Sequence, residues 1–294
     1  MPISCQIIAA HRWLARTTSA ACVTLMLAAC VAPSQQAPES AVLSPVRVAE
    51  IVASPDRSDA DRVNDARRKP QEMLMFIGVR PGMTALDLSA AGGYTTELIA
   101  RAVGPNGRVY GQSAPRPPES RPTQPEGAAS PIPMPAATPS RAGGGPRPSP
   151  VVLAERAKNP NARNIVAVVR PFADPAPPEC ASNCLDLVTL MFNYHDFGHL
   201  GVDRTAVNRA VFAALKPGGM YVIADHSGRP GTGISESGTL HRIEEAFLRA
   251  EVEQAGFKLA SEGNFLRNPS DPRDRNTPEP PQPKDEFVLK FVKP

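Results

Sequence analysis

The chain has 294 residues, 41% of them hydrophobic, which is enough apolar material for one large domain or two small ones. Its formal net charge is only +3, and two arginines in the first thirty residues account for +2 of it. A nearly neutral chain lacks the strongly basic surface of nucleic-acid-binding proteins, so we expect no nucleic-acid partner.

Residues 1–29 have the pattern of a secretory signal peptide. His11, Arg12 and Arg16 form a basic region, and the apolar run at 20–29 ends in small residues. The run is too short to cross a bilayer. We therefore predict that the protein is exported.

The apolar run closes in Leu27, Ala28, Ala29 and Cys30, a sequence that resembles a bacterial lipobox. The resemblance implies cleavage before Cys30 and a lipid anchor on its thiol. Because Val31 and not aspartate follows, it also implies a lipoprotein at the periplasmic face of the outer membrane. The alternative is an ordinary cleaved signal with a chance cysteine, which would release the protein into the periplasm.

Prolines divide the rest of the chain. The chain has 34 prolines, so their share of the residues is about twice the usual value of roughly 5%. Most of them lie in two regions. We predict a Pro, Ser and Ala tether at 30–58 and one domain at 59–294. Inserts near 114–150 and 268–284 are predicted to be disordered, because they contain few large apolar side chains to bury.

Within the domain, apolar runs alternate with helical patterns in the order expected of a parallel sheet with crossover helices. Strands are predicted at 84–88, 108–112, 165–169, 185–192, 220–224, 257–262 and 286–292. Helices are predicted at 59–77, 94–103, 151–158, 203–215 and 239–254. The sequence therefore predicts a single α/β domain.

Cys180 and Cys184 are the two cysteines that remain beyond Cys30. In an oxidising compartment they can close a small disulfide. Two free thiols in a loop are an equal alternative. Two cysteines offer too few ligands for a zinc site.

The segment 85–98, ALDLSAAGGYTTEL, is the most informative one. An apolar strand ends in the acid Asp87, the chain turns through small residues, and a helix begins. Small residues let the backbone approach a ligand, and the helix amino terminus offers unpaired N–H groups at the edge where open sheets bind ligands. The pattern predicts a ligand-binding turn.

Four features follow one another along the chain: this turn, the apolar strand at 185–192, the turn at 216–219 and the hairpin at the carboxyl terminus. Their order resembles that in the class I S-adenosylmethionine-dependent methyltransferases. The phrases FIGVRPGM, GGYTTELIARAVGP, FNYHDF, LKPGGMYVIADHS and FVLKFVKP resemble those of an exported methyltransferase group. The likeness covers roughly residues 70–294. It implies a Rossmann-like, mostly parallel seven-stranded sheet with an antiparallel last strand and helices on both faces.

The resemblance also implies S-adenosylmethionine as cofactor and a set of residues that bind it. The family's acid and three glycines fall on Asp87, Ser89, Ala91 and Gly93, so two glycines are replaced here. Gln112 stands where the family has its ribose-binding acid. Phe172 and Asp174 are the candidate ring and acid that contact the adenine, and Asn193 is a polar candidate after the fourth strand.

The methyl acceptor, whose identity the sequence does not give, is expected at the ends of the fourth and fifth strands. Tyr194, His195 and His226 are the candidate catalytic residues, because histidine titrates near neutral pH. The alternative is that these are loop histidines bonded to the backbone. His195 and His199 are four residues apart, but Gly198 and the loop context argue against a metal site, and we predict none.

Two other functions stay open. A catalytically weakened relative that binds an adenosyl ligand or a partner at the envelope fits the two missing glycines. A nicotinamide-dependent oxidoreductase fits less well, because a dinucleotide fingerprint has three spaced glycines and an acid about 20 residues on, where Gln112 stands.

Overall fold

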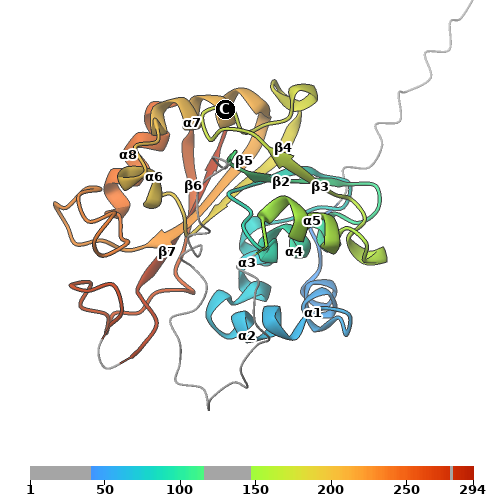
Figure 1. Ribbon diagram of the computed structural model, residues 1–294, viewed down its shortest axis with the longest axis horizontal. Helices are drawn as coiled ribbons and strands as arrows, with labels where there is room; N and C mark the ends of the chain where they lie inside the picture. The colour runs from blue at the N-terminus through green and yellow to red at the C-terminus, as the bar shows by residue number, and fades with distance from the viewer. Residues whose placement is uncertain (1–40, 116–146, 279–280) are drawn as a thin grey trace, which may run out of the picture. The chain divides into compact units, whose positions relative to one another are not determined.

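The computed structural model describes residues 41–115, 147–278 and 281–294 (Figure 1). The predicted signal peptide at 1–29, Cys30 and most of the predicted insert at 114–150 lie outside the described residues. Among the residues that are described, no helix is both long and apolar enough to cross a membrane.

A seven-stranded sheet in the order β3-β2-β1-β4-β5-β7-β6 forms the centre of the domain. The strands are β1 (Thr84–Leu88), β2 (Arg108–Ser113), β3 (Ile165–Val169), β4 (Leu185–Met191), β5 (Leu215–His226), β6 (Lys258–Gly263) and β7 (Glu286–Val292). The strands from β3 to β5 pair in parallel, and β7 is antiparallel to both β5 and β6. This confirms the predicted Rossmann-like α/β sheet.

Helices cover both faces of the sheet. Successive residues of a strand point to opposite faces, so each strand contributes side chains to the core on both sides. Ala85 and Leu187 belong to the core on the side of α1, α3 and α4, while Leu86 and Val188 belong to the core on the side of α7 and α8. Figure 1 shows α1, α2 and α3 grouped at one end of the molecule. The helices are α1 (Pro45–Ala53), α2 (Asp59–Arg68), α3 (Pro70–Ile77), α4 (Tyr94–Val103), α5 (Ser149–Arg156), α6 (Asp196–His199), α7 (Arg204–Ala214) and α8 (Glu245–Gln254), with 3₁₀ turns η1 (Pro160–Ala162) and η2 (Pro178–Cys180).

The predicted tether at 30–58 is wrong in its second half, where α1 forms. Ser44 caps the helix by accepting a hydrogen bond from the Arg47 N–H at 3.2 Å. Val48 and Ile51 are 1% and 3% exposed and pack into the same core as α3 and α4. Apolar residues three apart on one helix face are sufficient to dock it, so the domain begins near Ser44 rather than at residue 59.

The predicted helix at 59–77 is two helices, α2 and α3. They meet at Lys69, whose φ is 42°, and at Pro70, the first residue of α3. A proline lacks the N–H that would continue the helix, and it disfavours helical geometry in the residue before it. The break turns α3 so that Met73, Leu74 and Ile77 are buried.

The predicted helix at 239–254 begins only at Glu245, and the segment before it is a loop held by a buried ion pair. Arg242 is fully buried, and its Nη1 lies 2.8 Å from Asp271 Oδ2. Asp271 also accepts the Asp285 N–H at 2.6 Å. The described parts of 268–284 are therefore packed against the domain, which corrects the predicted disorder. Hydrogen bonds and a buried ion pair hold this segment, which has too few large apolar side chains to pack through them.

Cys180 and Cys184 form a disulfide, which resolves the two alternatives left by the sequence. The predicted bounds of β1, β3, β7 and α4 are confirmed, and those of β2, β4, β6, α5 and α7 differ by one or two residues. The larger difference is at β5. This strand begins at Leu215 rather than 220 and bulges between Leu185 and Leu187 of its partner β4.

Candidate active site

The turn between β1 and α4 lies at the point where the strand order reverses. β1 pairs with β2 on one side and with β4 on the other. The connections from β1 and from β4 leave to opposite faces, which opens a crevice at the carboxyl ends of these strands. The geometry therefore makes the turn at 89–93 the ligand-binding edge of the sheet.

The turn has three residues with left-handed backbone. The φ angles are 57° at Ser89, 47° at Ala91 and 78° at Gly93. Glycine adopts this conformation freely, whereas a residue with a Cβ is strained by about 1 kcal/mol or more. Such strain at an alanine is retained where the surrounding structure fixes the loop, and it is typical of functional turns.

Asp87 lies beneath the turn as a buried carboxylate, only 2% exposed. It accepts hydrogen bonds from Thr96 Oγ1 at 2.6 Å and from Thr189 Oγ1 at 2.7 Å. Burial raises the pKa of Asp87 to about 6, although the two threonine hydrogen bonds act in the opposite direction. The charge of Arg68 also acts to lower the pKa of Asp87, but burial outweighs it.

Gln112 does not have the role that the resemblance implied for it. Its side chain is fully buried, accepts the Ser89 N–H at 2.9 Å and donates to the Arg170 carbonyl at 2.6 Å. Both ends of the amide are used by backbone groups, so it does not reach out to a ribose. Gln112 instead fixes the start of the turn.

Gly93 faces α5 rather than open space. A Cβ placed on it would lie 2.7 Å from Leu153 Cδ2 and 2.9 Å from Arg156 Cδ. Arg156 Nε also donates to the Gly92 carbonyl at 2.6 Å. A Cβ on Gly92, in contrast, would meet nothing within 4 Å. Gly92 is thus the place where the backbone is open to a ligand, and Gly93 is the place where α5 docks.

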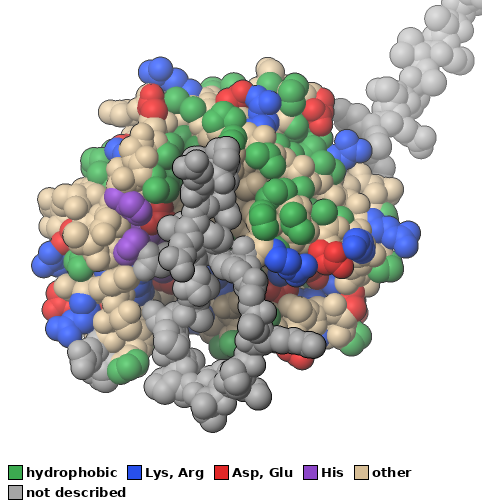
Figure 2. All heavy atoms as spheres, viewed as in Figure 1, with side chains coloured by type: hydrophobic (Ala, Val, Ile, Leu, Met, Phe, Trp, Pro, Cys, Tyr) green, Lys and Arg blue, Asp and Glu red, His purple; other side chains and the backbone are tan. Residues whose placement is uncertain are grey.

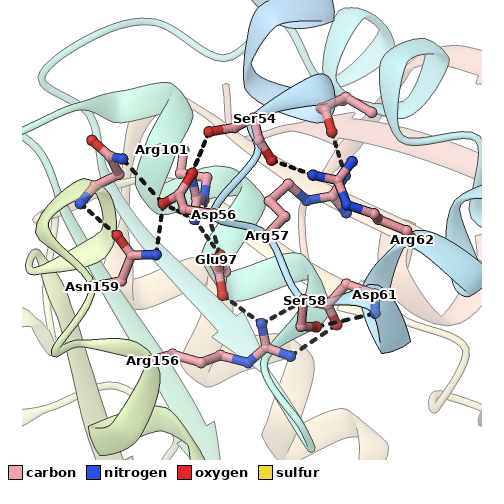
Figure 3. A network of polar contacts seen from close by, with 12 residues as sticks. Ser54, Asp56, Arg57, Ser58, Asp61, Arg62, Glu97, Arg101, Arg156 and Asn159 are labelled. Carbon is pink, nitrogen blue, oxygen red and sulfur yellow. Dashed lines mark hydrogen bonds and ion pairs between the residues drawn. The ribbon is translucent and has the colours of Figure 1, made fainter.

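Arg156 ties the turn to a network of polar contacts that reaches the helices at the amino-terminal end (Figure 3). Its Nη1 lies 2.6 Å from Asp61 of α2, and it also pairs with Glu97 of α4. Glu97 in turn pairs with Arg101, which binds Asp56 at 2.9 Å. This network fixes the turn, α2 and α4 relative to one another.

Arg68, Tyr94 and Phe192 close the space beside the turn. The Arg68 guanidinium lies over the Phe192 ring, 4.3 Å from its centroid, and burial lowers the pKa of Arg68 to about 10. Phe192, which follows β4, has a φ of 60°. The cavity that these residues line measures only ≈ 20 Å³.

Phe172 and Asp174 lie after β3, but neither is aimed at the turn. The Phe172 ring packs on the Phe197 ring at a centroid distance of 4.7 Å. The Asp174 side chain is 57% exposed and pairs with Arg170. Phe172 therefore packs on another aromatic side chain and Asp174 faces solvent beside Arg170.

The predicted catalytic role of Tyr194 is wrong. Its ring is fully buried, and its hydroxyl lies 3.0 Å from Glu251 Oε2 and accepts from Asn208 Nδ2 at 2.9 Å. These partners belong to α7 and α8, so Tyr194 points into the helix layer. It packs the core and does not reach the edge of the sheet.

His195 is held between two carboxylates. Its Nδ1 lies 2.6 Å from Asp225 Oδ1, and its Nε2 lies 3.0 Å from Asp196 Oδ1. Burial alone would lower the pKa of His195, but the two carboxylates outweigh it and raise this pKa to about 10. An imidazole that holds its proton at neutral pH is not a general base, which corrects the prediction for this residue.

His226 has the opposite electrostatic environment. It is 5% exposed at the end of β5, and burial together with nearby Lys284 and His195 holds its pKa well below the ordinary value of 6.5. Its Nδ1 lies 3.0 Å from Glu286 Oε1. It is therefore a neutral imidazole at neutral pH.

Asn193 bonds to Asp196 rather than to the turn, its Nδ2 donating to Oδ2 at 2.6 Å. Asp196 also contacts His241, whose Nδ1 lies 3.2 Å from Oδ1. His241 was not predicted as a site residue, because it lies 45 residues further along the chain in a segment predicted to be helical. No local spacing could have connected it with Asp196.

An adenosyl cofactor fits the backbone of the turn, but not the packing of the side chains beside it. The buried acid, the strained turn and the open approach at Gly92 suit such a group. A cavity of ≈ 20 Å³ is far smaller than the roughly 300–1,000 Å³ of ligand pockets. Arg68 and Phe192 must therefore move when a ligand of that size enters.

Solved structures with the same fold include methyltransferases. The complex between the Haloferax volcanii Trm112 methyltransferase activator and a candidate methyltransferase matches at 15% identity and a TM-score of 0.50, over 86% of this chain and 99% of the other. A SAM dependent methyltransferase from Aquifex aeolicus matches at 15% identity and a TM-score of 0.48, over 86% and 100%. Aeropyrum pernix fibrillarin with natively bound S-adenosyl-L-methionine matches at 17% identity and a TM-score of 0.41, over 73% and 68%.

No protein-family model matches the sequence, and no curated protein does either. The likeness to solved structures is one of fold. The chain has the Rossmann-like fold found in S-adenosylmethionine-dependent methyltransferases.

Proposed function

We propose that this protein is an S-adenosylmethionine-dependent methyltransferase that acts on an unidentified acceptor. The observation that carries the proposal is the strained turn at 89–93 above a buried acid, at the reversal point of a sheet with this strand order. The cofactor would supply a methyl group on a sulfonium, which is transferred by in-line displacement.

Each residue of the site has a role in this proposal. Asp87 accepts the ammonium group of the cofactor, directly or through water, and this cation stabilises the ionised carboxylate. Gln112 holds the turn through the Ser89 N–H. The protein's main task is to align the acceptor and exclude water.

His226, rather than His195, is the proton acceptor that we propose where the acceptor carries a proton. His226 is neutral at neutral pH and lies at the end of β5, whereas His195 is protonated. Its low exposure means that it serves only an acceptor that enters the crevice.

We also propose that the protein is exported and anchored through Cys30, on the sequence pattern of the leader. Mass spectrometry of the membrane fraction tests this. An acylated amino-terminal Cys30 supports the anchor, and a soluble mature chain with an unmodified start elsewhere removes it.

The proposed activity is tested first by binding. Calorimetry with S-adenosylmethionine, S-adenosylhomocysteine and NAD should give binding of the two adenosyl compounds and none of NAD. Tight NAD binding would favour an oxidoreductase instead. Transfer of a labelled methyl group to envelope extract then identifies the class of acceptor.

A weakened relative that binds an adenosyl ligand without transferring a methyl group is the second candidate. Ala91 in a left-handed conformation and the use of both ends of the Gln112 amide by the backbone favour it. Adenosyl binding with no methyl transfer to any envelope fraction would decide for this candidate.

A further inference from the structure

The four histidines in the described part of the chain gather at one place, the carboxyl ends of β4 and β5. The ring centroids of His195 and His226 are 5.4 Å apart, those of His195 and His241 are 5.7 Å apart, and those of His199 and His241 are 5.5 Å apart. Two aspartates, Asp196 and Asp225, lie among them. The proposed methyltransferase chemistry uses only His226 of this group.

Three side chains of the group have the geometry of ligands around one point. His195, Asp196 and His241 each offer one ligand atom, and these atoms all lie within 4.8 Å of one another. They come from separate parts of the chain, since His195 and Asp196 follow β4 while His241 precedes α8. The fold, and not a local motif, brings them together.

The Nε2 atom of His195 is the strongest sign that a ligand belongs here. It is buried and has no hydrogen-bond partner of proper geometry, although Asp196 Oδ1 lies 3.0 Å away. The residue itself is fully buried. Nε2 therefore faces the Asp196 carboxylate as an ion pair without a well-aligned hydrogen bond, which is a poorly satisfied arrangement for a buried ring nitrogen.

The surroundings fix the orientation of these side chains as outer-shell partners do in metal sites. Asp225 is fully buried, receives the His195 N–H at 2.8 Å and lies 2.6 Å from Nδ1, which leaves Nε2 as the free coordinating atom. Asn193 donates to Asp196 Oδ2 at 2.6 Å and leaves Oδ1 toward the histidines. A carboxylate behind a coordinating histidine and a hydrogen bond on a coordinating carboxylate are the usual second shell.

We propose that His195 Nε2, the Asp196 carboxylate and His241 bind a divalent first-row transition metal ion, with Zn²⁺ as the probe. Two imidazoles and one carboxylate match the three-ligand sets of zinc sites that keep an open position, whereas Mg²⁺ and Ca²⁺ require mostly oxygen ligands. The ion takes the place of a proton between Nε2 and Asp196.

The site is accessible from solvent. The His241 side chain is 19% exposed, and Figure 2 shows histidine side chains at the surface of the face that it displays. The open position of the ion would accept an oxygen or nitrogen of a small molecule at the edge of the sheet where the acceptor is expected. The proposal does not depend on the adenosyl cofactor, because metal binding is measured without it.

Calorimetry of the full chain, stripped with a chelator and titrated with Zn²⁺, should show one site per chain. The Co²⁺-loaded protein should show visible bands without a thiolate charge-transfer band, because no cysteine contributes to this site. Absence of a Zn²⁺ site, or a thiolate band that accounts for all of the bound Co²⁺, overturns the proposal.

Variants assign the ligands. His241→Ala and Asp196→Asn should each weaken Zn²⁺ binding by about 100-fold or more, and Asp225→Asn by about 10- to 100-fold. Asp174→Asn, which changes an exposed carboxylate paired with Arg170, is the matched control and should leave the affinity unchanged. Circular dichroism confirms folding of each variant. Equal affinity in His241→Ala, Asp196→Asn and wild type would show that the ion binds elsewhere, and the proposal fails.

Discussion

Asp87 is a buried acid whose ionisation costs stability at neutral pH. Burial raises its pKa from 3.8 to about 6. The folded state therefore prefers the protonated form, and the stability that this form provides is fully present below pH 3.8 and is lost as the pH rises through about 6. At neutral pH the protein therefore carries a buried ionised acid that Arg68 and the two threonines stabilise only in part.

We predict that Asp87→Asn stabilises the folded protein at pH 8, because asparagine keeps the shape and can bond to both threonines without the buried charge. The gain in free energy of unfolding should be on the order of 2 to 3 kcal/mol at pH 8 and close to zero at pH 4. Urea unfolding at the two pH values measures it. The same variant should bind S-adenosylmethionine about tenfold or more weakly. A loss of stability at pH 8 would contradict the role of burial.

Ala91 carries backbone strain that glycine would remove. With φ at 47°, Ala91→Gly should relieve about 1 kcal/mol of strain, partly offset by the greater chain entropy of glycine when unfolded. We expect stability to change by less than about 1 kcal/mol and S-adenosylmethionine binding to tighten or stay unchanged. Thermal melts and calorimetry check both.

Ala90→Gly is the matched control for this substitution. Ala90 is adjacent, has no left-handed backbone and is 7% exposed, so the variant should destabilise the protein by about 0.5 to 1 kcal/mol. If wild type binds no adenosyl ligand and Ala91→Gly does not restore binding, the methyltransferase proposal is wrong.

The sequence identified the turn residues because a strand, an acid and small residues are consecutive there. It could not identify the role of Gln112, Tyr194 or His241, because each of these depends on a partner far along the chain. Gln112 bonds to the turn 23 residues before it, and Tyr194 bonds to Glu251 of α8. Polar side chains at strand ends are compatible with binding a ligand, bonding to backbone or packing, and only the fold selects among these roles.

At the scale of elements, strands were predicted more reliably than helix ends. The central strands β1 and β4 and the second half of β5 are largely apolar and buried on both faces, which leaves a strong signal. Helix ends depend on single residues, as at Lys69 and Pro70, or on a tertiary contact, as where the Arg242 and Asp271 pair holds a loop that has helical periodicity. A local sequence pattern can indicate a helix end that single residues determine. It cannot indicate a helix end that a tertiary contact determines.

The docking of α5 on the turn leads to a prediction about two adjacent glycines. Gly93→Ala should lower the free energy of unfolding by about 2 kcal/mol or more, since its Cβ would lie 2.7 Å from Leu153 Cδ2 and its φ is 78°. Gly92→Ala, where a Cβ meets nothing within 4 Å, should change stability by less than about 0.5 kcal/mol. Chemical unfolding of the two variants distinguishes them. Equal stability would show that α5 does not pack on Gly93.

At the scale of the whole molecule, the polar network connects the amino-terminal helices with the turn. Asp56 follows α1, Asp61 belongs to α2, and both reach arginines whose other partners lie on α4 or at the turn (Figure 3). Arg68 at the end of α2 also covers the Phe192 ring, so this helical group contacts the side chains beside the turn. The segment predicted as a tether is thus part of the structure around the site.

Ile51 tests whether α1 is an integral part of the domain. Ile51→Ala should lower the free energy of unfolding by about 2 to 4 kcal/mol, because the side chain is 3% exposed in the core shared with α3 and α4. Val46→Ala on the same helix is the control, since Val46 is 69% exposed and should contribute less than about 0.5 kcal/mol. Thermal and urea unfolding measure both. If α1 were only a tether, the two variants would be equally harmless, and the domain would begin at α2 as the composition had suggested.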